Sequence, residues 1–176
     1  YLASVLYMDA MVGQVLAALD ASDHADNTIV VFWSDHGYHL GEKERYRKFS
    51  LWDDSTHVPL IIRLPPSLEL DWKPGGECRK AVSLQDLYPT LMELANLEPP
   101  HRLDGHSLVP QLLDPATARE QPAVTVNDWN TAYAVRTEKR NYISSEDGEE
   151  LYDRGRDPHQ WHNLAREPQY RAEMDK

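Results

Sequence analysis

Residues 29–33 form a short, almost wholly apolar run with the sequence IVVFW. A run of this length and composition is typical of a strand buried on both faces of a parallel sheet. The sequence then changes at once to SDHGYH, with Asp35 and His36 directly after the strand and Gly37 where a sharp turn is needed. Ligands of open α/β sheets bind just outside the carboxyl ends of strands, so residues 34–39 are the expected site of chemistry.

The segments around this corner predict an α/β domain. Residues 1–20 carry apolar side chains at helical spacing, which predicts a helix packed on the sheet, and residues 58–64 (VPLIIRL) predict a second buried strand. The loop before that second strand is long and charged, and such loops in compact domains are usually functional or disordered. A further helix is expected from Asp86, as its N-cap, to the residue before Pro99.

Beyond residue 121 the pattern shifts to short strands separated by polar turns. The expected strands are 123–126, 131–137, 141–145 and 150–152, with Asp147-Gly148 as a hairpin turn. Trp129, Tyr133 and Trp161 are interpreted as packing residues of this small antiparallel sheet. The sequence therefore predicts one α/β domain over residues 1–120 and a smaller subdomain over 121–176, ending in a mostly exposed helix.

Composition excludes several classes of function. The net charge is −11, which argues against a nucleic-acid partner because phosphate binding needs clustered Lys and Arg. No membrane association is expected, since we find no apolar run near the roughly 20 residues that span a bilayer. Cys78 is the only cysteine, so neither an internal disulfide nor a cysteine zinc site can form.

Several motifs carry a resemblance to a known family. The strings SDHGYHLGE and KFSLWDDSTHVPLII resemble the second half of a type I sulfatase of the alkaline phosphatase superfamily. The resemblance continues through VSLQDLYPTLMELANL, LDGHSLVPQLL and ELYDRGRDPHQWHNLA, and so covers most of the chain. The Asp-His pair after the strand is most similar to the iduronate- and choline-sulfatase branch. The resemblance implies part of a layered α/β/α sheet followed by a small antiparallel C-terminal sheet and a terminal helix.

The resemblance also implies a divalent metal held by Asp35 and His36. Ca²⁺ is the expected ion, and it needs about six to eight oxygen ligands, so further ligands are required. Mn²⁺ is the alternative, because it accepts an imidazole more readily. The ordinary alternative for Asp35 is a capping or turn carboxylate.

Lys48 resembles the family lysine that contacts the sulfate, and a fixed ammonium would stabilise the charge that develops on the ester oxygens. A solvated surface lysine is the alternative, and Lys43, Arg45 and Arg47 are close enough in sequence to be confused with it. His39 is expected at the rim of the site, where it would protonate the leaving group or orient the substrate.

The family's nucleophile is a formylglycine made from a Cys/Ser-x-Pro-x-Arg motif, and no such string occurs in this sequence. The paired aspartates that open the family's first strand are also missing. We therefore expect the C-terminal portion of a sulfatase, inactive alone, which joins the N-terminal portion of the same protein to act on a sulfate-ester small molecule or sulfated saccharide. The residues themselves do not reveal the location, for which the resemblance favours a periplasmic, extracellular or lysosomal compartment. A phosphonate or phosphodiester hydrolase and a noncatalytic domain are the alternatives.

Overall fold

The structure is a computed structural model that describes residues 1–72, 74–127 and 131–175, so Trp129 lies outside the described residues. The chain forms two compact units. The first comprises Tyr1–Phe32 and Leu60–Asp71, and the second comprises Trp33–Pro59 and Trp72–Lys176. These units divide the chain differently from the predicted domains 1–120 and 121–176, whose boundary stays a prediction.

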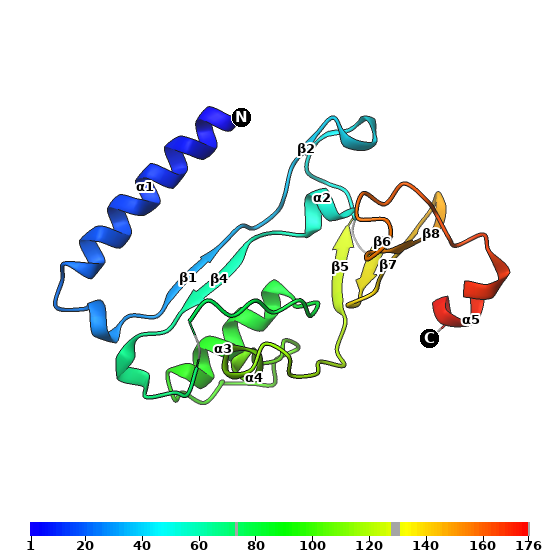
Figure 1. Cartoon of the computed structure of the whole chain (residues 1–176). Helices are drawn as coiled ribbons and strands as arrows, with labels where there is room; N and C mark the ends of the chain where they lie inside the picture. Colours follow the sequence, from blue (N-terminus) through cyan, green and yellow to red (C-terminus); the bar gives the residue numbers. More distant parts are fainter. Residues whose placement is uncertain (73, 128–130, 176) are drawn as a thin grey trace. The chain divides into compact units, whose positions relative to one another are not determined.

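The first unit holds one long helix and a pair of strands. Its elements are α1 (Leu2–Asp20), the 3-10 turn η1 (Ala25–Asn27), β1 (Val30–Trp33), β4 (Leu60–Arg63) and η3 (Pro66–Leu68). The two strands form a two-stranded sheet, and the chain runs outward along β1 and returns along β4 (Figure 1). Both predicted strands exist, but they are only partly buried, and Trp33 is exposed.

Helix α1 confirms the helix predicted from the apolar spacing, although none of its residues is buried. The expected packing of its apolar side chains on a sheet is therefore not seen, because two strands offer little apolar surface to cover a helix of 19 residues. The expectation that no apolar run approaches membrane length was wrong. By length and composition α1 could cross a bilayer, with a mean hydropathy of 1.6, but the core helix of a soluble domain passes the same test.

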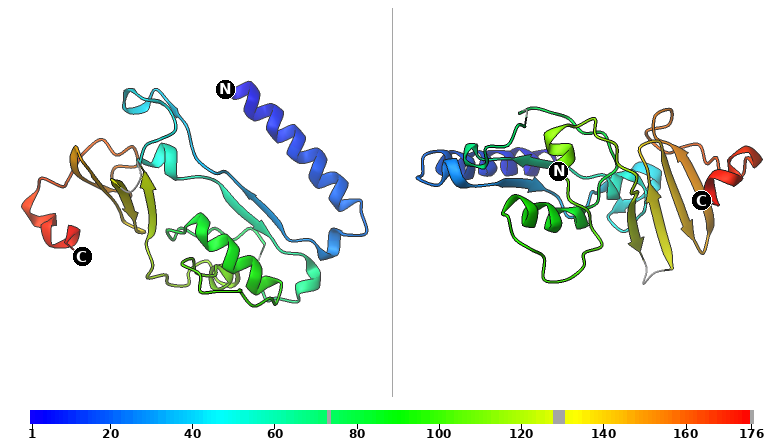
Figure 2. Two further views of the ribbon diagram at one scale, coloured as in Figure 1. Left: turned by 180° about the vertical axis from the view of Figure 1, so that it is seen from behind. Right: turned by 90° about the horizontal axis from the view of Figure 1, so that it is seen from below.

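The second unit contains the predicted C-terminal sheet. Four antiparallel strands lie in the order β5 (Ala123–Asn127), β6 (Ala132–Arg136), β7 (Arg140–Ser145) and β8 (Gly148–Asp153), as Figure 2 shows. Alternate residues of these strands face one core, where Ala134, Ile143 and Tyr152 pack together. Leu51 packs against the same cluster. The segment before β4 is thereby fixed to the C-terminal sheet.

The last hairpin of this sheet turns one residue earlier than predicted. Ser145 pairs with Gly148, so the two-residue turn is Glu146-Asp147 and not Asp147-Gly148. Gly148 follows the turn with a φ of 121°, which L side chains rarely adopt. The glycine was thus a correct signal for the hairpin, while its position within the turn was misassigned.

One group of helical segments in the second unit contains a buried carboxylate, that of Asp86. The segments are η4 (Leu84–Asp86), α3 (Leu87–Leu94) and α4 (Val109–Leu113). Asp86 is the N-cap of α3, as predicted, but its side chain makes no capping hydrogen bond to α3; Ser83 is the N-cap of η4 and forms a capping box with Asp86. Asp86 is 1% exposed and accepts hydrogen bonds from the backbone N–H groups of Ser83 (2.7 Å) and His106 (2.8 Å). Arg119 pairs with the same carboxylate at 2.8 Å.

The remaining elements of the second unit are short. They are β2 (His39–Leu40), η2 (Glu42–Glu44), β3 (Tyr46–Arg47), α2 (Asp53–Thr56), η6 (Pro168–Tyr170) and α5 (Arg171–Met174). β2 and β3 pair antiparallel, with His39 opposite Arg47. The long charged loop of the sequence is thus an ordered β-ribbon followed by one helical turn.

Replacing Asp86 with alanine should lower the free energy of unfolding by about 3–5 kcal/mol, because Arg119 would be left as an unpaired buried charge. Chemical denaturation measures the loss. Asp104→Ala is the matched control, since Asp104 is exposed in a neighbouring loop and should change stability by less than about 0.5 kcal/mol. Equal effects of the two substitutions would contradict this role of Asp86.

Candidate functional site

The corner after β1 is held against the backbone of α2. The Gly37 N–H donates to the Ser55 carbonyl at 2.8 Å. A Cβ atom on Gly37 would lie 2.0 Å from the Asp54 carbonyl oxygen, so any other residue would push the corner away from α2. Gly37 is therefore needed for this close approach, and it is not among the residues with positive φ that a sharp turn would have suggested.

Asp35 and His36 lie together at this corner. The Asp35 Oδ2 atom is 3.5 Å from the ring nitrogen Nε2 of His36. The backbone N–H of His36 donates a hydrogen bond to Asp35 Oδ1 at 3.0 Å. The other ring nitrogen, Nδ1, is 2.8 Å from the Gly37 carbonyl oxygen and must donate to it. When the ring is neutral, Nε2 therefore carries a lone pair, and this lone pair lies on the side of the Asp35 carboxylate. A histidine that donates one ring N–H to a carbonyl and presents the other nitrogen as a ligand is common in metal sites.

His39 lies in the interior and not at the rim where it was predicted. Its side chain is 0% exposed, and Nε2 is 2.7 Å from Ser50 Oγ. Nδ1 is 3.7 Å from Asp54 Oδ2, and the ring meets the Trp52 ring edge-on at 6.1 Å. Since the described residues shield His39 fully, its position suits holding the loop better than transferring a proton to a substrate.

The contacts of Lys48 differ from those of the neighbouring cations Lys43 and Arg45. Lys48 is exposed, and its ammonium lies 5.3 Å from the Phe49 ring centre and forms no ion pair with any described residue. Lys43 is instead surrounded by aromatic rings, and the Arg45 guanidinium lies over Trp52 at 5.2 Å. Lys48 is therefore available to an anion, a property that it shares with Arg47.

Asp53 connects this region to the C-terminal sheet, a role that the sequence did not reveal. Its carboxylate contacts Arg136, lies 3.8 Å from Arg154 Nε and accepts a hydrogen bond of 2.9 Å from Gln160 Nε2. Burial, together with the positive charge of Arg154, lowers the pKa of Arg136 to about 10. The carboxylate supplies the counter-charge that the two buried guanidinium groups need.

Asp53 and Asp54 are adjacent in the sequence, and the structure gives them different partners. Consecutive residues of a helix point about 100° apart, so α2 directs Asp53 to the sheet and Asp54 to His39. The pair of acidic residues in WDDS was the available signal, but the arginine lies more than 80 positions along the chain, where no local pattern points to it.

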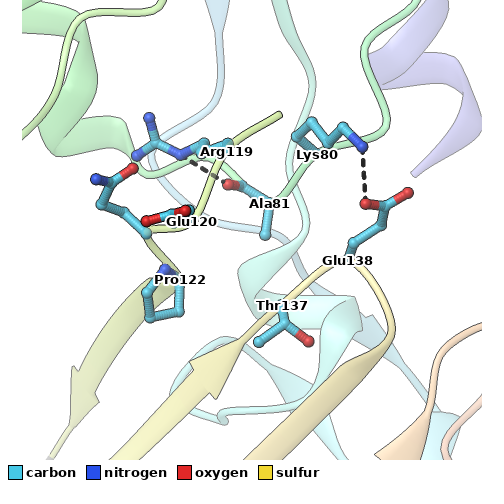
Figure 3. Close-up of a pocket in the computed structure, with 8 residues that line it drawn as sticks. Lys80, Ala81, Arg119, Glu120, Pro122, Thr137 and Glu138 are labelled. Carbon is cyan, nitrogen blue, oxygen red and sulfur yellow. Dashed lines mark hydrogen bonds and ion pairs between the residues drawn. The ribbon is translucent and has the colours of Figure 1, made fainter. Parts of the chain in front are cut away.

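A small pocket lies elsewhere in the second unit and contains none of the predicted site residues (Figure 3). Its lining includes Lys80, Arg119 and Glu138. Lys80 pairs with Glu138 at 2.8 Å, and Arg119 donates to the Ala81 carbonyl and pairs with Asp86. Both cations are thus already neutralised, so this pocket offers no charge to an anionic ligand.

Replacing Asp53 with alanine should destabilise the protein by about 2–4 kcal/mol, because two guanidinium groups would lose their counter-charge. Asp54→Ala is the control within the same helical turn. Its carboxylate is 40% exposed, so the expected loss is below about 1 kcal/mol. Thermal and chemical denaturation measure both variants, and a larger loss for Asp54→Ala would contradict the assignment.

Several known proteins are similar to this chain in sequence. The chain is 37% identical to a sulfatase of Formosa agariphila over 99% of its length, and 32% identical to human arylsulfatase K over 94%. It spans about a third of these relatives, 34% and 33% of their lengths.

Two solved structures have the same fold. One is an enzyme in complex with its substrate D-glucosamine-2-N,6-O-disulfate, with a TM-score of 0.81 and 27% identity over 99% of this chain and 37% of the other. The second is the phosphonate monoester hydrolase of Agrobacterium radiobacter, with a TM-score of 0.73 and 29% identity over 93% and 36%.

The family model described as Sulfatase matches residues 1–97. That range includes α1, which favours a helix of the family's domain over a separate membrane span. It also includes the Asp35–His36 corner, the ribbon that carries Lys48 and helix α2. The predicted fold class is confirmed by the solved structures, and the chain belongs to the sulfatase family.

Proposed function

We propose that this sequence supplies part of the active site of a sulfuric ester hydrolase. The observation that carries the proposal is the Asp35–His36 donor pair, which lies at the end of β1 inside the range that matches the Sulfatase family. The Asp-His order further supports the iduronate-2-sulfatase and choline-sulfatase branch as the specific assignment within the family.

The donor chemistry of the corner fits a divalent cation. Asp35 Oδ2 and His36 Nε2 are 3.5 Å apart, and two acceptors at this separation can share one ion at ligand distances of about 2.3–2.6 Å. A bound cation would supply positive charge to an anionic ester. Ca²⁺ is the expected ion, and Mn²⁺ is the alternative because imidazole is a ligand.

The described residues supply only part of such a site. They contain no group of three or more His, Cys, Asp or Glu side chains that could hold a metal. We infer that the other ligands, and the formylglycine nucleophile of the family, come from an N-terminal portion of the same protein. The chain spans about a third of its curated relatives, which supports this inference.

Lys48 would bind the sulfate group. Its ammonium is exposed and unpaired within the described part of the chain, so an arriving anion displaces no ion pair. A sulfate ester gathers negative charge on its nonbridging and leaving oxygens as the bond to sulfur breaks, and a fixed cation stabilises that charge more strongly than the ground state. His39 would hold this loop through Ser50, in place of the proton-transfer role expected from the sequence.

A sulfated saccharide is the proposed substrate class. The structure with its bound D-glucosamine disulfate supports this class by fold and by sequence similarity. A phosphonate monoester hydrolase is the second candidate, since an enzyme of that activity has the same fold at 29% identity, and phosphoryl and sulfuryl groups need similar clamps. Turnover of an aryl sulfate against an aryl phosphonate by the full-length protein separates the two, and a large preference for the phosphonate would contradict the sulfatase assignment.

Lys48→Ala in the full-length protein should lower kcat/KM for an aryl sulfate by about 100- to 1,000-fold, the usual cost of losing one charge-stabilising donor. Steady-state kinetics measure the change. Lys139→Ala is the control, because Lys139 is exposed on the turn between β6 and β7. Unchanged kinetics in Lys48→Ala would show that another cation, with Arg47 as the first candidate, binds the sulfate.

Removing divalent metal from the full-length protein with a chelator should abolish turnover, and Ca²⁺ or Mn²⁺ should restore it. Asp35→Asn should weaken metal binding at least about 10-fold in a calorimetric titration, because the amide carries no charge. Asp147→Asn, in the exposed hairpin turn, is the control. Equal affinities of the two variants would exclude Asp35 as a ligand.

A further inference from the structure

Lys43 occupies an aromatic cage, which we define as Trp52, Tyr152 and Trp161. The Lys43 ammonium lies 4.8 Å from the ring centre of Trp52, 5.0 Å from that of Tyr152 and 5.2 Å from that of Trp161. Distances below about 6 Å are those of cation–π contacts. Lys43 also donates a hydrogen bond to the Gln160 carbonyl oxygen. A single ammonium thus contacts rings from three separate segments of the chain.

Two rings of the cage, those of Trp52 and Tyr152, are held by hydrogen bonds to one carboxylate. Glu150 accepts a hydrogen bond of 2.8 Å from Trp52 Nε1 and a second one from the Tyr152 hydroxyl. Burial lowers the pKa of Lys43, while the negative charges of Glu150, Asp157 and Asp54 act against that shift. The rings and the surrounding carboxylates therefore favour a charged lysine at this position.

The loop that Lys43 holds is strained. Four residues in it that are not glycine have positive φ angles: Lys43 (51°), Glu44 (57°), Arg47 (78°) and Phe49 (68°). L side chains avoid this region, and residues held in it cluster at functional sites, where surrounding contacts maintain them. Lys48 lies between two of the four. Its orientation therefore depends on contacts that keep the loop in this conformation.

Several contacts can keep the loop in this conformation. The short ribbon pairs His39 with Arg47, and Ser50 bonds to the buried His39 ring. Both of these contacts are made within the segment from β2 to α2. The Lys43 cage ties the turn of the ribbon to the C-terminal sheet, in addition to the packing of Leu51 in the core of that sheet, because Tyr152 lies in β8 and Trp161 lies in the loop that follows it.

We propose that Lys43 is a positioning residue: its cage of Trp52, Tyr152 and Trp161 anchors the strained loop to the C-terminal sheet and thereby orients Lys48. The orientation of Lys48 toward a sulfate rests on the function proposed above. The anchoring itself depends only on the contacts of Lys43. The C-terminal sheet is then a support for catalysis.

Lys43→Met in the full-length protein tests this proposal, because methionine keeps the apolar stem and removes the charge. We expect kcat/KM for an aryl sulfate to fall about 10- to 100-fold, as for a misplaced catalytic group. Hydrogen–deuterium exchange of residues 40–50 should become faster, while exchange in β5–β8 stays unchanged. Lys43→Arg keeps a cation over the rings and should recover most of the activity. Lys139→Met, the same substitution at an exposed site, should alter neither measurement.

A double mutant separates positioning from general stabilisation. If Lys43 acts through Lys48, Lys43→Met should cause no further loss of kcat/KM in a Lys48→Ala background. An equal loss in both backgrounds, or unchanged exchange of residues 40–50 in Lys43→Met, would overturn the proposal. A wild-type protein that does not hydrolyse sulfate esters would instead contradict the proposed function, and the exchange measurement would still decide whether Lys43 anchors the loop.

Discussion

The candidate site depends on the docking of one helical turn, α2, between three partners. Its Ser55 carbonyl holds the corner that carries Asp35 and His36, its Asp54 faces His39, and its Asp53 pairs with the guanidinium groups of the C-terminal sheet. The Asp53 contact is the one most sensitive to change, because removing a partner from a buried ion pair leaves an uncompensated charge. The corner and the ribbon are thus fixed through the same four residues.

This arrangement explains why a small sheet follows the part of the chain that carries the site. Leu51 packs in the core of the sheet, Asp53 pairs with Arg136 on β6, and Lys43 enters a cage that Tyr152 of β8 helps to form. An exposed lysine on a mobile loop would have to be ordered each time an anion bound, at a cost in conformational entropy. A loop fixed at several points along a rigid sheet keeps the lysine in place and so avoids much of the entropy cost of binding.

The sequence predicted those features that local patterns determine. Apolar spacing identified α1, β1 and β4, turn residues identified the last hairpin, and the change from IVVFW to SDHGYH identified the corner. Features that depend on partners far along the chain were missed. His39 was expected at the rim because an imidazole suits proton transfer or substrate orientation, but the ribbon and α2 enclose it. The pairing of Asp53 with Arg136 could not be predicted, because the two residues are far apart in the sequence. The metal and sulfate roles of Asp35, His36 and Lys48 stay predictions.

In the proposed site, Asp35 and His36 bind one divalent cation and Lys48 binds the anionic ester. A crystal structure of the full-length protein with Ca²⁺ and a slowly hydrolysed sulfate ester tests this arrangement most directly. We expect the ion within about 2.3–2.6 Å of an Asp35 carboxylate oxygen and in contact with His36 Nε2, with the Lys48 ammonium about 2.7–3.0 Å from a sulfate oxygen. An ion bound without Asp35, or a Lys48 side chain directed away from the ester, would contradict the account.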